Sequence, residues 1–290
     1  MMNYANLHLH STHSDGGLRP SHLVRVAKCL GYKGLALTDH DVMSGVPELI
    51  AEAKAEGMRA ITGMELTCYL NDVNFHIVAL DFDIYCPGMV DFVDKLCHMR
   101  NEHTKKQFDL AIERGILVDI SWDEVLSYNP GCKWFCNEQV YRAIEIKGVM
   151  VSNDRRKTYE PAFKKGKAAT IKLEQPDAKE TLEQISRAGG VSVLAHPQDQ
   201  LQYVPLLVEM GLKGIEVSHP DIDEKCSVDA AKLAKEYGLY TSGGTDHTGA
   251  LGVCSGDYCV PALHGVSEEE FNAIIERRPL TREVENEYHM

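Results

Sequence analysis

The stretch Asn6-Leu7-His8-Leu9-His10-Ser11-Thr12-His13-Ser14-Asp15-Gly16 decides how the whole chain is interpreted. Apolar side chains alternate with His8 and His10, as in a β-strand, and a polar loop that contains Asp15 follows directly. Residues two apart on a strand lie on the same face, so the two imidazoles can bind one ion together. We therefore expect a strand over residues 5–10 that leads into a metal site.

A similar arrangement, in which an apolar run leads into imidazole or carboxylate side chains, returns later in the chain. The stretches are Leu35-Ala36-Leu37-Thr38-Asp39-His40, Gly63-Met64-Glu65, Phe75-His76, Leu194-Ala195-His196-Pro197 and Gly244-Thr245-Asp246-His247. The strand ends of a parallel β/α barrel gather on one face, so we expect these side chains to converge. Imidazole and carboxylate suit zinc, manganese and iron. The pattern predicts a hydrolytic site with several metal ions.

The composition is that of a globular protein with a large core. The chain has 290 residues, of which 44% are hydrophobic and 25% charged. No apolar run approaches the roughly 20 residues that span a bilayer, and the N-terminus does not have the layout of a signal peptide. We expect a cytoplasmic protein with no membrane partner. The nine cysteines are odd in number and irregularly spaced, which favours reduced thiols over a disulfide framework.

The net charge of −13 disfavours a protein that binds nucleic acid through its phosphates. We therefore expect no stable nucleic-acid partner. A net charge does not describe a local patch, so a polynucleotide substrate is disfavoured but not excluded.

Alternating strand and helix signals occupy the two ends of the chain. Strands are expected over residues 5–10, 34–38, 59–66, 74–82, 191–195, 214–218 and 240–242, with helices over 21–30, 47–57, 203–210 and 228–237 and another after the Asp177-x-x-Glu180 pattern. Residues 88–172 instead show helical periods, with short helices over 123–128, 138–147 and 155–165. The prediction is an α/β protein: a distorted (β/α)7 barrel in residues 1–87 and 173–290, with a mostly helical insert over 88–172 that caps the active site.

These motifs together resemble the polymerase-and-histidinol-phosphatase (PHP) family of metal-dependent phosphoesterases, over about residues 1–85 and 173–260. The resemblance is closest to the small-molecule branch with a helical insert, which includes nucleotide 3′,5′-bisphosphate phosphatases and a sugar cyclic-phosphate hydrolase. It implies a distorted seven-stranded barrel and three divalent metal ions (Mn, Fe or Zn). It also implies attack on phosphorus by a hydroxide that bridges two of the ions.

Carried over by motif, the resemblance implies three ligand sets, of which the first two share Glu65: His8, His10, Glu65 and Asp246 for the first ion; Glu65, His76 and His196 for the second; and Asp15, His40 and His247 for the third. Asp39 would orient a ligand imidazole. One departure concerns Asp246 and His247, which are adjacent here, whereas the family usually has one residue between them. A turn or bulge must therefore redirect one of the two side chains.

Other side chains are candidates to bind the substrate or to donate a proton to it. His219 ends an expected strand, where it can donate a proton to the substrate or be a polar residue at the rim. His13, Arg142 and Lys165 are candidates to bind a substrate phosphate, although cationic side chains more often form a solvated face.

The sequence is compatible with three functions. The leading hypothesis is hydrolysis of a small phosphorylated metabolite, namely a nucleotide bisphosphate or a phosphorylated sugar, including a cyclic phosphate. The alternatives are exonuclease-like cleavage of polynucleotide ends and a barrel that binds metal without catalysis.

Overall fold

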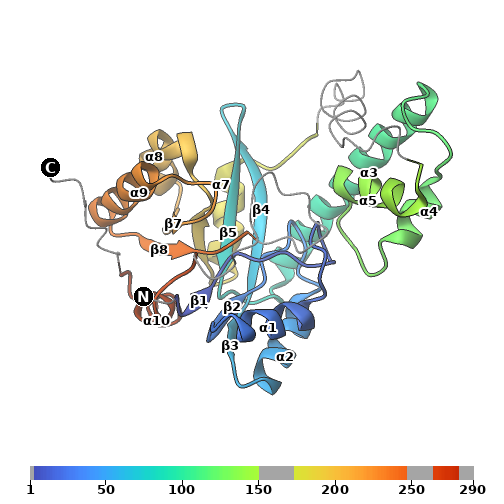
Figure 1. Ribbon diagram of the computed structural model, residues 1–290. Coiled ribbons are helices and arrows are strands. Elements are labelled where there is room, and N and C mark those ends of the chain that lie inside the picture. Colours follow the sequence, from blue (N-terminus) through green and yellow to red (C-terminus); the bar gives the residue numbers. More distant parts are fainter. Residues whose placement is uncertain (1–2, 150–172, 247–263, 281–290) are drawn as a thin grey trace, which may run out of the picture.

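The computed structural model describes residues 3–149, 173–246 and 264–280, and its strands form two sheets (Figure 1). The first sheet is parallel and has the order β1-β2-β3. The second has the order β4-β5-β6-β7-β8. The strand bounds are β1 Ala5–Asn6, β2 Gly34–Ala36, β3 Arg59–Ile61, β4 Gly63–Leu70, β5 Val73–Leu80, β6 Val191–Leu194, β7 Gly214–Ser218 and β8 Tyr240–Gly243.

The second sheet corrects the expectation of parallel strands throughout. The expected strand over residues 59–66 breaks at Thr62 into β3 and β4, and each half joins a different sheet. Strands β4 and β5 form an antiparallel hairpin, and β5 also pairs with β6 in antiparallel fashion. Asn71 and Asp72 join the hairpin with φ of 52° and 61°. Asn and Asp tolerate this left-handed conformation, which two-residue hairpin turns require.

Hydrogen bonds beyond the strands bring the two sheets together. The segment after β1 lies against the end of β8, with Leu7 N donating to Gly243 O (3.2 Å) and Asp246 N to His8 O (2.9 Å). Gly244 is required there, because a side chain would collide with the backbone of His8. The segment after β2 lies against β4, since Glu65 N donates to Asp39 O (3.2 Å). These contacts draw the metal-ligand motifs toward one another.

Helices cover the sheets in the order that the sequence predicts, with two differences. The expected helix over 203–210 is present as α8, but a 3-10 turn that was not predicted, η3, precedes it. Helix α10 was not predicted either, although Ser267 and Glu270 form a capping box ahead of Phe271. None of the described helices is long and apolar enough to span a membrane. The bounds are α1 Pro20–Cys29, α2 Val46–Ala55, α7 Ala178–Arg187, η3 Gln198–Tyr203, α8 Val204–Glu209, α9 Glu224–Tyr237 and α10 Glu268–Ile275.

Three helices of the insert lie to one side of the sheets: α3 (Pro87–Glu113), α4 (Trp122–Tyr128) and α5 (Asn137–Lys147) (Figure 1). The first part of α3 packs Met89 and Phe92 into the same core as β4 and α7. Its last part packs Phe108 and Ala111 into a separate cluster with residues of α4 and α5. Helix α3 therefore belongs to both cores, and the exact domain boundaries remain a prediction. The helix expected over residues 155–165 lies outside the described residues.

Candidate metal centre

Glu65 of β4 lies at the centre of the predicted ligands. Its carboxylate is buried and faces five imidazoles. Oε2 lies 3.3 Å from Nε2 of His8, 3.3 Å from Nε2 of His10 and 3.2 Å from Nδ1 of His40. Oε1 lies 2.8 Å from Nδ1 of His76 and 3.2 Å from Nε2 of His196. A carboxylate with two oxygens in this position is suited to bridging two cations.

The candidate ligands form three compact groups around this carboxylate, each with ligand atoms within 4.8 Å of one another: His8, His10, Glu65 and Asp246; His40, Glu65 and His76; and His10, Asp15 and His40. The first group contains the four residues implied for the first ion. The second contains His40 where the resemblance implies His196, which contacts the same carboxylate. The third contains His10 together with Asp15 and His40. His247, which the resemblance implies for this ion, lies outside the described residues.

The donor atoms in these groups fit divalent cations. Nε2 of His8, both ring nitrogens of His10 and Nδ1 of His40 are buried and lie 2.9–3.6 Å from carboxylate oxygens, but none of them forms a hydrogen bond within the described ranges. Buried polar atoms without a hydrogen bond are costly, and a bound cation would satisfy them. The set of imidazole and carboxylate donors is also the one that zinc, manganese and iron accept.

In the absence of a cation, the carboxylates and most of the imidazoles of the cluster stabilise each other's charged forms. Burial alone would raise the pKa of Glu65 and Asp246, but the surrounding imidazoles hold both pKa values well below their ordinary range. Burial alone would lower the pKa of His8 and His10, but nearby carboxylates raise both well above 6.5. His40 behaves differently, because burial lowers its pKa to about 4. Most of this cluster is thus held as ion pairs, which metal ions can replace by displacing protons.

Glu216 of β7 fixes the orientation of His8 and was not recognised in the sequence. It is buried, and its Oε1 accepts a hydrogen bond from Nδ1 of His8 at 2.9 Å, which leaves Nε2 of His8 free to bind an ion. Its Oε2 accepts from the backbone N of His196 at 2.7 Å. The available signal was a charged residue in the middle of the apolar strand Gly214–Ser218.

Asp39 contacts the loop that carries Asp15. Its oxygens accept hydrogen bonds from Ser11 N, Ser11 Oγ and Ser14 Oγ, each at 2.6 Å. The carboxylate therefore braces the backbone and hydroxyls of this loop, whereas the expected role was to orient a ligand imidazole.

His219, directly after β7, forms a further group with His8 and Glu216, whose ligand atoms also lie within 4.8 Å of one another. Its Nδ1 accepts a hydrogen bond from Asp221 N at 3.0 Å, so the neutral ring carries its proton on Nε2. Nε2 is buried and lies 3.5 Å from Oδ2 of Asp246. This tautomer suits a proton donor rather than a metal ligand.

The candidates for substrate binding lie in different surroundings. Nδ1 of His13 lies 2.7 Å from Ser44 Oγ. Nη2 of Arg142 donates to the carbonyls of Asp15 (3.3 Å) and Gly16 (3.1 Å). Lys165 lies outside the described residues. Trp134, which the sequence did not single out, stacks on His40 with ring centroids 4.9 Å apart.

Two backbone conformations mark the site as strained. Asp246 has φ of 48° and His196 has φ of 28°, both in the left-handed region that residues other than glycine rarely adopt. The left-handed backbone at Asp246 lies where we expected a turn or bulge, because Asp246 and His247 are adjacent in the sequence. Strain of this kind, about 1–3 kcal/mol per residue, persists where the surrounding structure imposes it.

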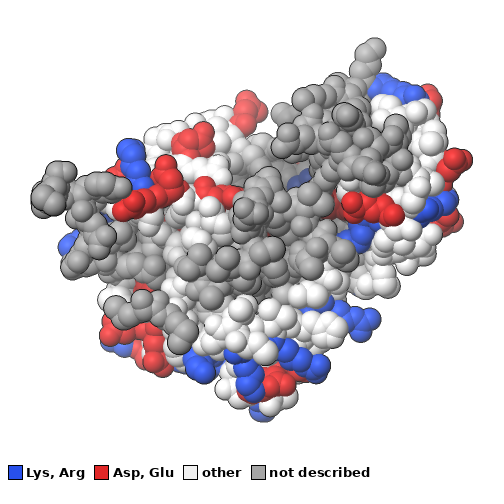
Figure 2. Space-filling view, viewed as in Figure 1, with Lys and Arg blue, Asp and Glu red and all other residues white. Residues whose placement is uncertain are grey.

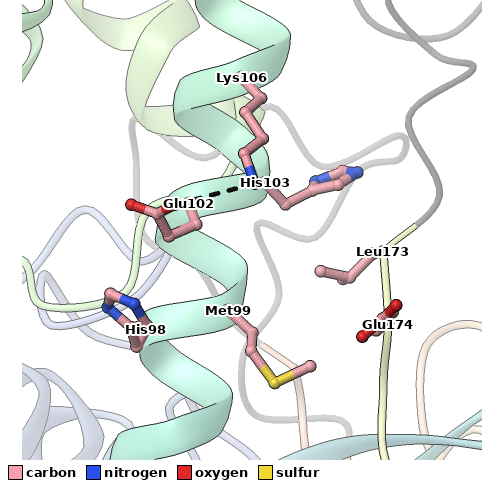
Figure 3. A pocket seen from close by; sticks show the side chains of 7 residues that line it. All are labelled: His98, Met99, Glu102, His103, Lys106, Leu173 and Glu174. Atoms are coloured by element: carbon pink, nitrogen blue, oxygen red, sulfur yellow. Dashed lines mark ion pairs between the residues drawn. The ribbon is translucent and has the colours of Figure 1, made fainter.

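A cavity of about 360 Å³ lies between α3 and residues 173–174 (Figure 3). Its lining residues are His98, Met99, Glu102, His103, Lys106, Leu173 and Glu174. On the opposite face of α3, Cys97, Asn101 and Thr104 bind the backbone of residues 133 and 135. The cavity is therefore separate from the metal centre and is not lined by any of the predicted ligands.

Buried and partly buried imidazoles and carboxylates converge from strands β4 and β5 and from segments that follow other strands of this α/β fold. Such a site is typical of a metal-dependent hydrolase. The model of the PHP domain family matches residues 6–188, more than half of the chain, and the chain belongs to this family. The chain is accordingly a metal-dependent phosphoric ester hydrolase, as the motifs predicted.

Curated relatives carry different activities. The chain is 29% identical to a phosphoribosyl 1,2-cyclic phosphate 1,2-diphosphodiesterase from Eggerthella lenta, over 85% of this chain and 95% of that protein. It is 32% identical to a 5′-3′ exoribonuclease from Haemophilus influenzae, over 83% of this chain and 88% of that protein. It is 25% identical to a 3′,5′-nucleoside bisphosphate phosphatase from Chromobacterium violaceum, over 83% and 86%.

A solved structure shows the same fold. A candidate metal-dependent phosphoesterase from Bifidobacterium adolescentis superimposes with a TM-score of 0.81 at 22% identity, covering 95% of this chain and 96% of that one. The prediction of a PHP-type α/β fold is confirmed.

Proposed function

We propose that this chain hydrolyses a phosphate ester of a small phosphorylated metabolite, either a nucleotide bisphosphate or a phosphorylated sugar, including a cyclic phosphate. Three divalent ions (Mn, Fe or Zn) would occupy the groups around Glu65. The observation that carries the proposal is the Glu65 carboxylate facing five imidazoles, with Asp15 and Asp246 beside them.

The residues around the groups have separate tasks in this reaction. Bound divalent cations supply a nucleophile at neutral pH by acidifying water, and they neutralise charge on phosphoryl oxygens. Glu216 keeps the proton of His8 on Nδ1, so Nε2 presents a lone pair. His219 holds a proton on Nε2 and can donate it to a phosphoryl or leaving oxygen. Ser11 and Ser14 direct their hydroxyls at Asp39, which supports a mechanism without a serine nucleophile.

The choice of a small substrate is supported by charge and by the relatives. The cyclic phosphodiesterase and the bisphosphate phosphatase both match over most of their length. The net charge of −13 is unfavourable for binding a polyanion such as RNA through its phosphates. On the described part of the face in Figure 2, basic side chains alternate with acidic ones and do not form a stripe.

A second candidate is exonucleolytic cleavage of RNA from a 5′ end. The observation in its favour is the 32% identity to the Haemophilus influenzae exoribonuclease. The same metal groups would serve it, so the two candidates differ in substrate binding and share their chemistry.

A panel of substrates separates these candidates. Metal-loaded protein is assayed against a ribose 1,2-cyclic phosphate, a nucleoside 3′,5′-bisphosphate and a short 5′-phosphorylated RNA, with Asp246→Asn as the inactive control. We expect kcat/KM to be highest for one of the two small substrates. Preference for RNA would replace the proposal by the exoribonuclease. No turnover of any substrate by fully loaded protein would favour a barrel that binds metal without catalysis.

A further inference from the structure

The insert holds the backbone of the loop that carries Asp15. Four consecutive carbonyls of this loop, those of residues 13–16, accept hydrogen bonds from one segment of the insert. We call this segment, residues 132–142, the clasp. The donors are Lys133 N (3.2 Å) and Trp134 N (3.3 Å) to His13 O, the side-chain amide of Gln139 to Ser14 O, and Nη2 of Arg142 to Asp15 O (3.3 Å) and Gly16 O (3.1 Å).

The clasp donors are themselves fixed in place. Gln139 is fully buried, and its Oε1 accepts from the backbone N of Cys136 at 2.8 Å. Nη1 of Arg142 lies 3.5 Å from Oδ1 of Asn129, whose Nδ2 donates to Gln139 O at 3.0 Å. A side chain held by several partners gives up little further entropy when it binds the loop. The clasp can therefore set the position of the loop backbone.

The clasp also contacts the second ligand of the same metal group. The Trp134 ring lies nearly parallel to the His40 ring, with an angle of 22° between them and 4.9 Å between centroids. Nε1 of Trp134 donates to Oδ2 of Asp41 at 3.1 Å, next to His40 in the chain. The guanidinium of Arg100 lies 5.2 Å from the Trp134 ring centroid. These contacts restrict the rotation of the His40 imidazole.

We propose that the clasp positions Asp15 and His40, so that the ion of the His10–Asp15–His40 group depends on the insert. The group of His8, His10, Glu65 and Asp246 takes its ligands from barrel segments alone and does not depend on it. Arg142 and Trp134 are then positioning residues that act through the two ligands. The inference rests on the proposed function only in assuming that divalent ions occupy these groups.

The test measures metal binding in the full-length protein. Arg142→Met keeps the aliphatic stem but removes both carbonyl contacts, and Arg142→Lys keeps a cationic donor. Each variant is loaded with Mn²⁺, dialysed against a weak chelator and analysed for metal per chain, and Mn²⁺ affinities are measured by titration. Loss of an outer contact of this kind costs on the order of 10–100-fold in metal affinity. We expect this loss at one site in Arg142→Met, a smaller loss in Arg142→Lys and partial recovery with added guanidinium.

The matched control is Lys147→Met on the same helix. Nζ of Lys147 pairs with Oε1 of Glu124 inside the insert at 2.7 Å and forms no hydrogen bond or ion pair with residues 13–16 among the described residues. Its metal content should equal that of the wild type. Trp134→Phe keeps an aromatic ring against His40 but loses the donor to Asp41. It should weaken the two groups that contain His40, less than Arg142→Met weakens its single site, and should leave the group of His8, His10, Glu65 and Asp246 unchanged.

Two results would overturn the inference. One is wild-type affinity at every site in Arg142→Met. The other is equal weakening of all sites in a variant whose circular dichroism and melting temperature are unchanged. Metal content is measured without a substrate, so this test is independent of the substrate panel. Absence of turnover in the wild type, together with a selective metal loss in Arg142→Met, would contradict the proposed function and still support the inferred role of the clasp.

Discussion

The part of the molecule built on the two sheets, called the barrel here after the expected fold, and the helices α3, α4 and α5, called the insert, contribute to the metal centre in different ways. The barrel supplies ligand side chains: His8 and His10 follow β1, Glu65 lies within β4, and all three are almost completely buried. The insert supplies no ligand to the described groups but binds the backbone of the Asp15 loop through residues up to 127 positions away. A ligand residue can therefore be recognised from the sequence around it, whereas the position of its side chain depends partly on a distant segment of the chain.

The largest expected effect comes from removing the charge shared by the barrel ligands. Glu65→Gln preserves the size of the side chain but leaves five imidazoles facing a neutral amide. We expect turnover to fall on the order of 10³-fold, because the cations that stabilise the transition state are lost. Phosphate release and metal content per chain measure this.

A buried carboxylate elsewhere in the barrel provides the control. Glu270 is buried and accepts a hydrogen bond from Thr241 Oγ1 at 2.7 Å, without belonging to a described metal group. Glu270→Gln should keep its metal. Full metal content in Glu65→Gln would show that the centre is not organised around this residue.

Metal removal should make the stability of the barrel site depend on pH. The raised pKa values of His8 and His10 give stabilisation that is complete below 6.5 and is lost as the pH rises through their folded values. The depressed pKa values of Glu65 and Asp246 give stabilisation that is complete above 4.5 and is lost as the pH falls. The pKa of His40, which burial lowers to about 4, acts in the other direction, because its contribution is lost as the pH falls below 6.5. Metal-free protein should thus be most stable near pH 6.5.

Melting temperatures between pH 5 and 9, with and without Mn²⁺, check this expectation. The melting temperature of the metal-free protein should fall toward pH 9, and Mn²⁺ should restore it because the ion replaces the lost protons. A metal-free protein that becomes more stable from pH 6 to 9 would contradict the assigned ion pairs.

Glu216→Gln tests the contact behind His8. A neutral amide can still accept from Nδ1 of His8, but it no longer favours the charge on a metal-bound imidazole. We expect metal affinity to fall about 10-fold, at the low end of the range for such contacts. Mn²⁺ titration measures this change. An unchanged affinity would mean that Glu216 serves only the fold.

Much of this arrangement was predictable from local patterns, and the remainder depends on contacts distant in sequence. The individual strands and helices and the local ligand motifs follow from residue spacing, because each pattern lies within one short stretch of the chain. The bounds of the insert and the assignment of ligands to ions stay predictions. The hairpin of β4 and β5 was missed although Asn71-Asp72 signalled its turn. Glu216 and Trp134 were missed because their partners, His8 and His40, lie far along the chain. Local periodicity carries no information about such pairs.

The smallest effect concerns a barrel contact that resembles the clasp. Thr38 Oγ1 accepts from Leu9 N (3.0 Å) and donates to Leu9 O (3.1 Å), between the two ligand histidines of the first motif. Thr38→Val keeps the shape but leaves the buried Leu9 N–H without this acceptor, which should lower the free energy of unfolding by about 1–3 kcal/mol. Metal affinity should hardly change, because Thr38 N still donates to Leu9 O at 2.8 Å. Denaturant unfolding and Mn²⁺ titration check both values. If Thr38→Val lost an ion as Arg142→Met is expected to do, backbone support would govern both halves of the centre, and the contrast between barrel and insert would fail.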